Sequence, residues 1–113
     1  DDAESVRAIR RAVGLGVTFF DTADAYGTGH SERILGKALD GIRHKVVIAT
    51  KFGYTFNENA REITGELCSA AYIMKACRAS LRRLQTDYID LYQLHRWSIP
   101  TSSPPVPGFR RMM

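Results

Sequence analysis

The chain has 113 residues, of which 44% are hydrophobic and 25% are charged, and its formal net charge is +4. This composition is typical of one soluble globular domain, and no apolar run reaches the roughly 20 residues that a membrane-spanning helix needs. The 16 lysine and arginine residues are scattered and are not interleaved with aromatic residues, which argues against a nucleic-acid-binding protein.

The cysteine content indicates neither a disulfide scaffold nor a zinc site, because the chain has only Cys68 and Cys77. Two free thiols are typical of a reducing compartment, so we expect a cytoplasmic protein. The first residues, Asp1 to Glu4, do not form the basic and then apolar stretch of a signal peptide.

The first predicted element is a helix over residues 3–13, whose apolar side chains recur at helical spacing (Val6, Ile9, Ala12 and Val13). Gly14 and Gly16 are expected to end it. The apolar run 17–20, which ends at Asp21, predicts a buried strand.

The middle of the chain predicts a loop, a short helix, a strand and a second loop. Residues 22–30 are rich in glycine and small polar residues, and Ser31 is expected to cap a helix with the apolar stripe Ile34, Leu35, Ala38 and Leu39. Gly41 ends this helix, and residues 46–51 predict a second buried strand. The polar residues 52–66 predict a long loop.

The last predicted elements are a longer helix and a third strand. Ser69 is expected to cap the helix, whose buried face would consist of Ile73, Cys77, Leu81 and Leu84. Residues 88–95 predict the strand. Strands that are joined by single helices run parallel, so the sequence predicts an α/β fold.

Two arrangements of such a fold compete, a doubly wound open sheet and a (β/α)8 barrel. The first usually has a glycine-rich turn directly after a strand, whereas Gly14-Leu15-Gly16 precedes one. Asp21, Lys51 and His95 end three successive predicted strands, and barrel active sites lie where the carboxyl ends of the strands meet. Each residue alone has a structural explanation, but together they favour a barrel with a site at this face.

Four segments resemble the motifs of the aldo-keto reductases and occur in the same order. They are residues 19–27, 27–32 with Leu35-Gly36, 48–51 and 88–95. The resemblance extends over about residues 3–96. It implies a partial (β/α)8 barrel with about strands two to four and helices one to three, within one domain over residues 1–97. It also implies NADPH/NADP+ as cofactor, no metal ion, and a small aldehyde or ketone as the substrate that is reduced to an alcohol.

The resemblance also assigns roles to four side chains. Tyr26 would be the general acid that protonates the carbonyl oxygen, and the ammonium of Lys51 beside it would favour the phenolate. Asp21 would pair with Lys51 and contact the cofactor, and His95 would orient the carbonyl and donate a hydrogen bond to it.

The chain departs from this family in its length and its last residues. An intact barrel takes about 250 residues, so we expect an N-terminal part that is inactive alone and binds NADPH weakly. All four prolines lie within residues 98–113, where the family would continue into a helix. We expect this segment to be a disordered or frame-shifted tail.

Two other functions remain open from the sequence. The same barrel could serve as a non-enzymatic regulatory subunit, like the β-subunits of potassium channels. A small α/β binding module would require the polar residues at the strand ends to be accidental. The complete set of four residues favours the oxidoreductase.

Overall fold

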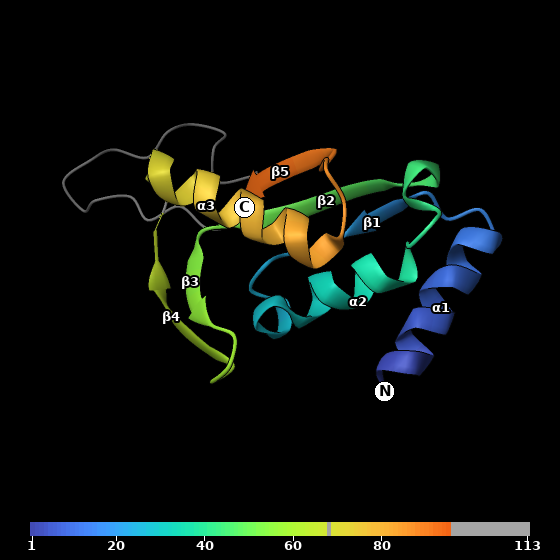
Figure 1. Ribbon diagram of the computed structural model, residues 1–113, viewed down its shortest axis with the longest axis horizontal. Helices are drawn as coiled ribbons and strands as arrows, with labels where there is room; N and C mark the ends of the chain where they lie inside the picture. Colours follow the sequence, from blue (N-terminus) through green and yellow to red (C-terminus); the bar gives the residue numbers. More distant parts are fainter. Residues whose placement is uncertain (68, 96–113) are drawn as a thin grey trace.

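The computed structural model describes residues 1–67 and 69–95 of the chain. Its elements, shown in Figure 1, are α1 (Asp2–Gly14), β1 (Phe19–Asp21), the short 3-10 helix η1 (Tyr26–Gly29), α2 (His30–Ala38), the short 3-10 helix η2 (Arg43–Lys45), β2 (Val47–Phe52), β3 (Tyr54–Asn57), β4 (Glu62–Glu66), α3 (Ala70–Leu84) and β5 (Leu91–Leu94). None of the helices within these residues is both long enough and apolar enough to cross a bilayer.

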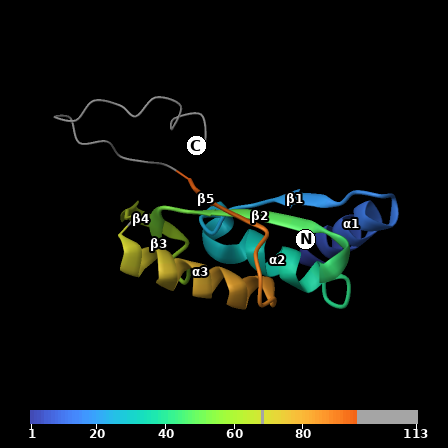
Figure 2. The ribbon, with the colours of Figure 1, turned by 90° about the horizontal axis from the view of Figure 1, so that it is seen from above.

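The central sheet has three parallel strands in the order β1-β2-β5. Figure 2 shows that α2 and α3 lie on the same side of this sheet, whereas the described residues place no helix on the opposite side. Helix α1 packs beside α2. The predicted α/β class and the parallel order of the three strands are therefore confirmed.

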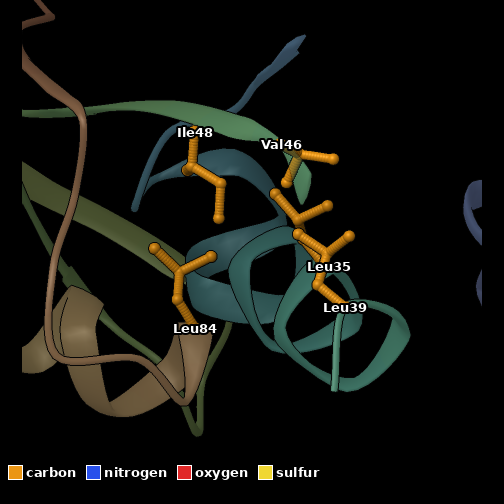
Figure 3. Close-up of a cluster of buried hydrophobic side chains, with 5 residues drawn as sticks. All are labelled: Leu35, Leu39, Val46, Ile48 and Leu84. Carbon is orange, nitrogen blue, oxygen red and sulfur yellow. The ribbon is translucent and has the colours of Figure 1, made fainter. Parts of the chain in front are cut away.

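The hydrophobic core lies between the sheet and its two covering helices. Figure 3 shows its five buried members, Leu35 and Leu39 near α2, Val46 and Ile48 at β2, and Leu84 at the end of α3. The predicted apolar stripe of α2 supplies Leu35 and Leu39, which confirms that face of the helix. Burying a side chain such as Leu39 or Ile48 stabilises the fold by about 1.5–3 kcal/mol.

Glycine at position 36 allows α2 and α3 to approach each other closely. A Cβ atom on Gly36 would lie 2.6 Å from the carbonyl oxygen of Arg83 and 2.7 Å from that of Leu84. Because those are backbone atoms, a larger residue would push the end of α3 away from α2. The residue therefore sets the spacing of the helix layer beneath the sheet.

The prediction that residues 17–20 and 46–51 form buried strands is wrong for one face of the sheet. Phe19, Val47 and Leu91 are 52%, 40% and 44% exposed. Phe19 pairs with Val47, and Leu91 pairs with Ala49 two residues further along β2, so all three side chains lie on the same face. This is the face without a helix, which explains the exposure of these apolar residues.

Residues 52–66 do not form the predicted long loop, because most of them build an antiparallel hairpin. Strands β3 and β4 pair with each other, with an irregularity in register between Thr55 and Phe56. At the turn, the side chain of Asn57 accepts a hydrogen bond from the amide of Ala60 at 3.1 Å. The polar composition obscured the alternation of aromatic residues along β3.

Two predicted helix caps have different outcomes. Ser69 caps α3, since its hydroxyl accepts a hydrogen bond from the amide of Tyr72 at 3.2 Å. Ser31 does not cap α2, because the capping residue is Gly29, two residues earlier, at φ 96°. The hydroxyl of Ser31 instead lies 2.8 Å from that of Thr22 in the loop after β1.

The buried face of α3 is rotated from the predicted one. Leu84 is buried as expected, but Ile73, Cys77 and Leu81 are only half-buried. The other fully buried residues of this helix are Ala76, Ser80 and Arg83. Arg83 faces the interior because its guanidinium pairs with the carboxylate of Glu32 in α2, and this rotates the buried face of α3.

Three predictions concern residues outside the part of the chain that the structure describes. These are the free thiol of Cys68, the domain boundary at residue 97 and the tail over residues 98–113. Cys77 is free and half-buried.

Candidate active site

The carboxyl ends of β1 and β2 bring the first two predicted site residues together. Lys51 Nζ donates hydrogen bonds to Asp21 Oδ1 at 2.6 Å and to the carbonyl oxygen of Thr22 at 2.9 Å. Asp21 is paired with Ala49 in the parallel register. Lys51 follows Ala49 by two residues, so its side chain lies on the same face of the sheet as that of Asp21. The side chain of Lys51 is only 16% exposed, and its ammonium group is thereby fixed in position.

His95 directly follows β5 and continues the pairing of the sheet. Its amide donates a hydrogen bond to the carbonyl oxygen of Phe52 at 2.6 Å. Its imidazole meets the ring of Tyr26 edge to face, with ring centroids 5.6 Å apart and planes at 86°. The third strand is shorter than the predicted range 88–95, but His95 lies at its carboxyl end as predicted.

Tyr26 comes from the loop that follows β1 and begins η1. The amide of Asp24 donates to the carbonyl oxygen of Lys51 at 3.1 Å, which holds this loop along the end of β2. Lys51 Nζ lies 5.4 Å from the centroid of the Tyr26 ring, and this tyrosine is 44% exposed. The structure therefore brings Asp21, Tyr26, Lys51 and His95 to one end of the sheet.

The surroundings of His95 favour the neutral imidazole. Burial lowers the pKa of this histidine from its ordinary value, the ammonium of Lys51 lowers it further, and the carboxylate of Asp21 opposes the shift. Its Nδ1 atom is buried and has no hydrogen-bond partner among the described residues. A neutral imidazole retains one N–H donor, which suits hydrogen bonding to a developing oxyanion.

Tyr54 is a neighbour of the site that the sequence did not indicate. Its ring packs edge to face on His95, with centroids 4.9 Å apart and planes at 73°. The hydroxyl of Tyr72 in α3 donates to the carbonyl oxygen of Tyr54 at 3.0 Å and fixes its position. Because residues 52–66 were predicted to be a loop, no sequence pattern placed Tyr54 against the imidazole of His95.

A buried polar network lies on the opposite face of β2. Thr50, next to Lys51, donates from its hydroxyl to Glu32 Oε2 at 2.7 Å. Glu32 Oε1 accepts hydrogen bonds from Ser80 Oγ at 3.1 Å and from Arg83 Nε at 2.8 Å. Side chains alternate along a strand, so β2 presents Lys51 to one face and Thr50 to this network.

The described residues form no cluster of three or more histidine, cysteine, aspartate or glutamate side chains that could hold a metal ion. The four converging side chains are instead a carboxylate, a phenol, an ammonium and an imidazole. This set can transfer a proton to an oxygen atom and stabilise negative charge on it.

The model of the aldo/keto reductase family matches residues 1–109. The chain belongs to the aldo/keto reductase family. It is 44% identical over 102 residues to the aldo-keto reductase YhdN of Bacillus subtilis, covering 88% of this chain and 30% of that protein.

Solved aldo-keto reductases show the same arrangement. The holo form of aldo-keto reductase AKR11C1 from Bacillus halodurans is 45% identical and superposes with a TM-score of 0.77, over 83% of this chain and 31% of that one. An aldo-keto reductase from Klebsiella pneumoniae in complex with NADPH is 36% identical with a TM-score of 0.69, over 88% and 31%. This chain therefore spans about a third of the length of these aldo-keto reductases.

These similarities settle the choice between the two α/β arrangements. The parallel sheet and its helices correspond to part of the (β/α)8 barrel of the aldo-keto reductases, and the barrel is not closed within the described residues. The prediction of a partial barrel is confirmed, and the bare face of the sheet corresponds to the interior of that barrel.

Proposed function

We propose that this chain carries the catalytic residues of an NADPH-dependent oxidoreductase that reduces an aldehyde or ketone to an alcohol. The observation that supports this proposal most strongly is the convergence of Asp21, Tyr26, Lys51 and His95 at the carboxyl end of the parallel strands. Active sites of (β/α)8 enzymes lie at this end.

In this proposal Tyr26 is the general acid that gives its phenolic proton to the carbonyl oxygen of the substrate. The ammonium of Lys51 stabilises the phenolate that remains, and Asp21 holds Lys51 in position through their hydrogen bond. The neutral imidazole of His95 donates a hydrogen bond to the same carbonyl oxygen.

The residues present fit the reacting end of a nicotinamide cofactor. The side chain of Asp21 is 54% exposed, and Tyr26 is also accessible at the open end of the sheet, so both can contact a bound molecule. Bound NADPH would supply the hydride, and the protein would supply the proton. The complex of the Klebsiella pneumoniae relative with NADPH supports this choice of cofactor.

A hybrid barrel tests the proposal. Residues 1–95 of this chain would replace the matching segment of YhdN, to which the chain is 44% identical. We expect the hybrid to reduce a simple aromatic aldehyde with consumption of NADPH. Tyr26→Phe should lower kcat by about 10²–10⁴-fold, because the proton donor is lost. Tyr88→Phe, at an exposed tyrosine that packs on Arg43, is the matched control and should leave kcat unchanged.

The outcomes separate the proposal from its rivals. A hybrid that binds NADPH tightly and turns over no carbonyl compound would support a non-enzymatic regulatory role instead. Equal activity of the Tyr26→Phe and Tyr88→Phe hybrids would contradict the role of Tyr26. The chain alone should bind NADPH weakly, and tight, saturable quenching of its fluorescence by NADPH would contradict that expectation.

A further inference from the structure

A cavity of about 400 Å³ lies between the β3–β4 hairpin and α3. Because α3 covers the sheet from the side opposite to Lys51 and Asp21, this cavity is separate from the candidate active site (Figure 2). Its wall is largely apolar, with Phe56, Leu67 and Ala76 among the lining residues. The charged residues that line it are Asp24, Glu58, Lys75 and Arg83.

Asp24 is the unusual residue of this cavity. It is 1% exposed, and its Oδ1 atom accepts no hydrogen bond from any of the described residues. A buried carboxylate oxygen without a donor is costly, and buried polar atoms of native proteins nearly always have a partner. The carboxyl group of Asp24 has a backbone hydrogen bond with Ala25, but its Oδ1 atom has no partner among the described residues. An oxygen without a donor in the wall of a cavity therefore indicates a ligand that supplies one.

The neighbouring charges do not satisfy Asp24. Arg83 is the cation that faces it from α3, but Arg83 already donates to Glu32 at 2.8 Å and to Glu58 at 2.7 Å. Lys75 also lines the cavity but is exposed and forms no ion pair within the described residues. The guanidinium of Arg83 therefore already pairs with two carboxylates, and no hydrogen bond from it to Asp24 is present among the described residues.

The other groups around Asp24 add no positive charge. Glu32 faces it from α2, Tyr72 from α3 and Tyr92 from β5. The hydroxyl of Tyr92 is itself buried without a partner among the described residues. Burial, and then the charge of Glu32, raise the pKa of Asp24 to about 7. Near neutral pH a cation would pair with the ionised carboxylate and offset both effects.

We propose that this cavity binds a small organic amine, whose ammonium group donates a hydrogen bond to Asp24 and whose apolar body packs against Phe56 and Leu67. An anion is disfavoured at Asp24, because it would lie against the carboxylate of Asp24 with Glu32 close by, and Arg83 already donates to Glu32 and Glu58. A neutral alcohol would supply the hydrogen bond but would not neutralise the carboxylate. The site is independent of carbonyl reduction.

The test uses the complete ¹⁵N-labelled 113-residue chain and benzylamine as the probe. We expect saturable shifts of the amide signals of Asp24, Ala25 and Ala76 as benzylamine is added. Benzyl alcohol, which has the same ring and no charge, should bind at least about tenfold more weakly, because a hydrogen bond between ionised groups is the stronger one. The affinity for benzylamine should rise from about pH 6 to about pH 8, as Asp24 ionises.

Asp24→Asn keeps the shape of the side chain and removes its charge, so it should weaken binding at least about tenfold. Asp87→Asn, at an exposed aspartate, is the matched control and should bind benzylamine as the unaltered chain does. Failure to observe saturable shifts would overturn the proposal, whether the amine does not bind or the cavity does not persist in solution. Equal affinities for the amine and the alcohol, or an unchanged affinity of Asp24→Asn, would overturn it as well.

Discussion

Lys51 and Asp21 lie on neighbouring parallel strands and form an ion pair of 2.6 Å between Nζ and Oδ1. A second hydrogen bond, from Lys51 Nζ to the carbonyl oxygen of Thr22, restricts the ammonium to one position. The ammonium of Lys51 also faces the ring of Tyr26 at 5.4 Å. The ion pair thus joins β1 to β2 and holds the ammonium of Lys51 close to the ring of Tyr26.

Asp21→Asn should lower kcat of the hybrid barrel for aldehyde reduction by about 10–100-fold, because a neutral amide holds the ammonium of Lys51 less firmly. Asp40→Asn, at an exposed residue in the turn after α2, should change kcat less than twofold and serves as the control. Steady-state consumption of NADPH measures both variants. An Asp21→Asn hybrid with unaltered kcat would show that the carboxylate has no part in catalysis.

Arg83→Met should destabilise the hybrid by about 3–5 kcal/mol, because it leaves the carboxylate of Glu32 buried without its cation. The side chain of Glu32 is 0% exposed and that of Arg83 is 6% exposed. Arg33→Met breaks an ion pair with Glu58 whose arginine is 55% exposed, so it should cost only about 0–1 kcal/mol. Urea unfolding monitored by circular dichroism gives both values. Similar losses for the two variants would mean that burial does not distinguish the two pairs.

Gly36→Ala should destabilise the hybrid by about 1–3 kcal/mol, since the new methyl group would overlap the backbone of Arg83 and Leu84. Gly14→Ala is the matched substitution at the end of α1, where a Cβ atom meets nothing within 4 Å. It should instead be neutral or stabilise the protein by about 0.5–1 kcal/mol. Thermal unfolding of the two variants checks the difference, and equal midpoints would refute the close approach of α2 and α3.

Asp24 should make the stability of the protein fall as the pH rises through about 7. Its pKa in the folded chain is about 7, against an ordinary value of 3.8, so folding binds a proton at this carboxyl group. The contribution to stability is present below the unfolded pKa and is lost as the pH rises through the folded one. Asp24→Asn, which cannot ionise, should therefore be more stable than the unaltered protein at about pH 8, by about 1–3 kcal/mol.

Urea midpoints at about pH 5 and about pH 8 measure this effect, and the gain from Asp24→Asn should appear mainly at the higher value. Other shifted groups also change the stability with pH, but they contribute equally to the variant and to the unaltered protein at any one pH. The pKa of His95 is lowered from 6.5, so its contribution is present above that value and is lost at more acidic pH. The lowered pKa values of Glu58 and Asp90 act below 4.5 and 3.8. A gain of equal size at both pH values would contradict the assignment to Asp24.

The sequence was sufficient to predict that these four residues lie close together, because each stands at or just after the carboxyl end of a strand. Asp21, Lys51 and His95 end apolar segments, and parallel strands bring such ends together whatever the rest of the fold does. The stripe of α2 was equally clear, because Leu35 and Leu39 are one helical turn apart and both enter the core.

Features that depend on contacts between distant segments could not be predicted in this way. The burial of Arg83 could not be predicted, since nothing near it in the sequence points to its partner Glu32, which lies 51 residues away. The hairpin β3–β4 was missed because its strands are short and polar. The exposure of Phe19 arises because the described residues place no helix on that face of the sheet, which no local pattern records.

In strand β2 two neighbouring side chains point to opposite faces of the sheet: Thr50 contacts the buried Glu32, and Lys51 contacts Asp21. Deleting a single residue upstream within the strand would exchange the faces of both side chains, so that the ammonium of Lys51 would point toward the helices and the hydroxyl of Thr50 toward Asp21. Deleting two residues would shorten the strand but return every side chain to its original face of the sheet. Over this stretch the gene should accordingly tolerate in-frame losses of codon pairs better than losses of one codon.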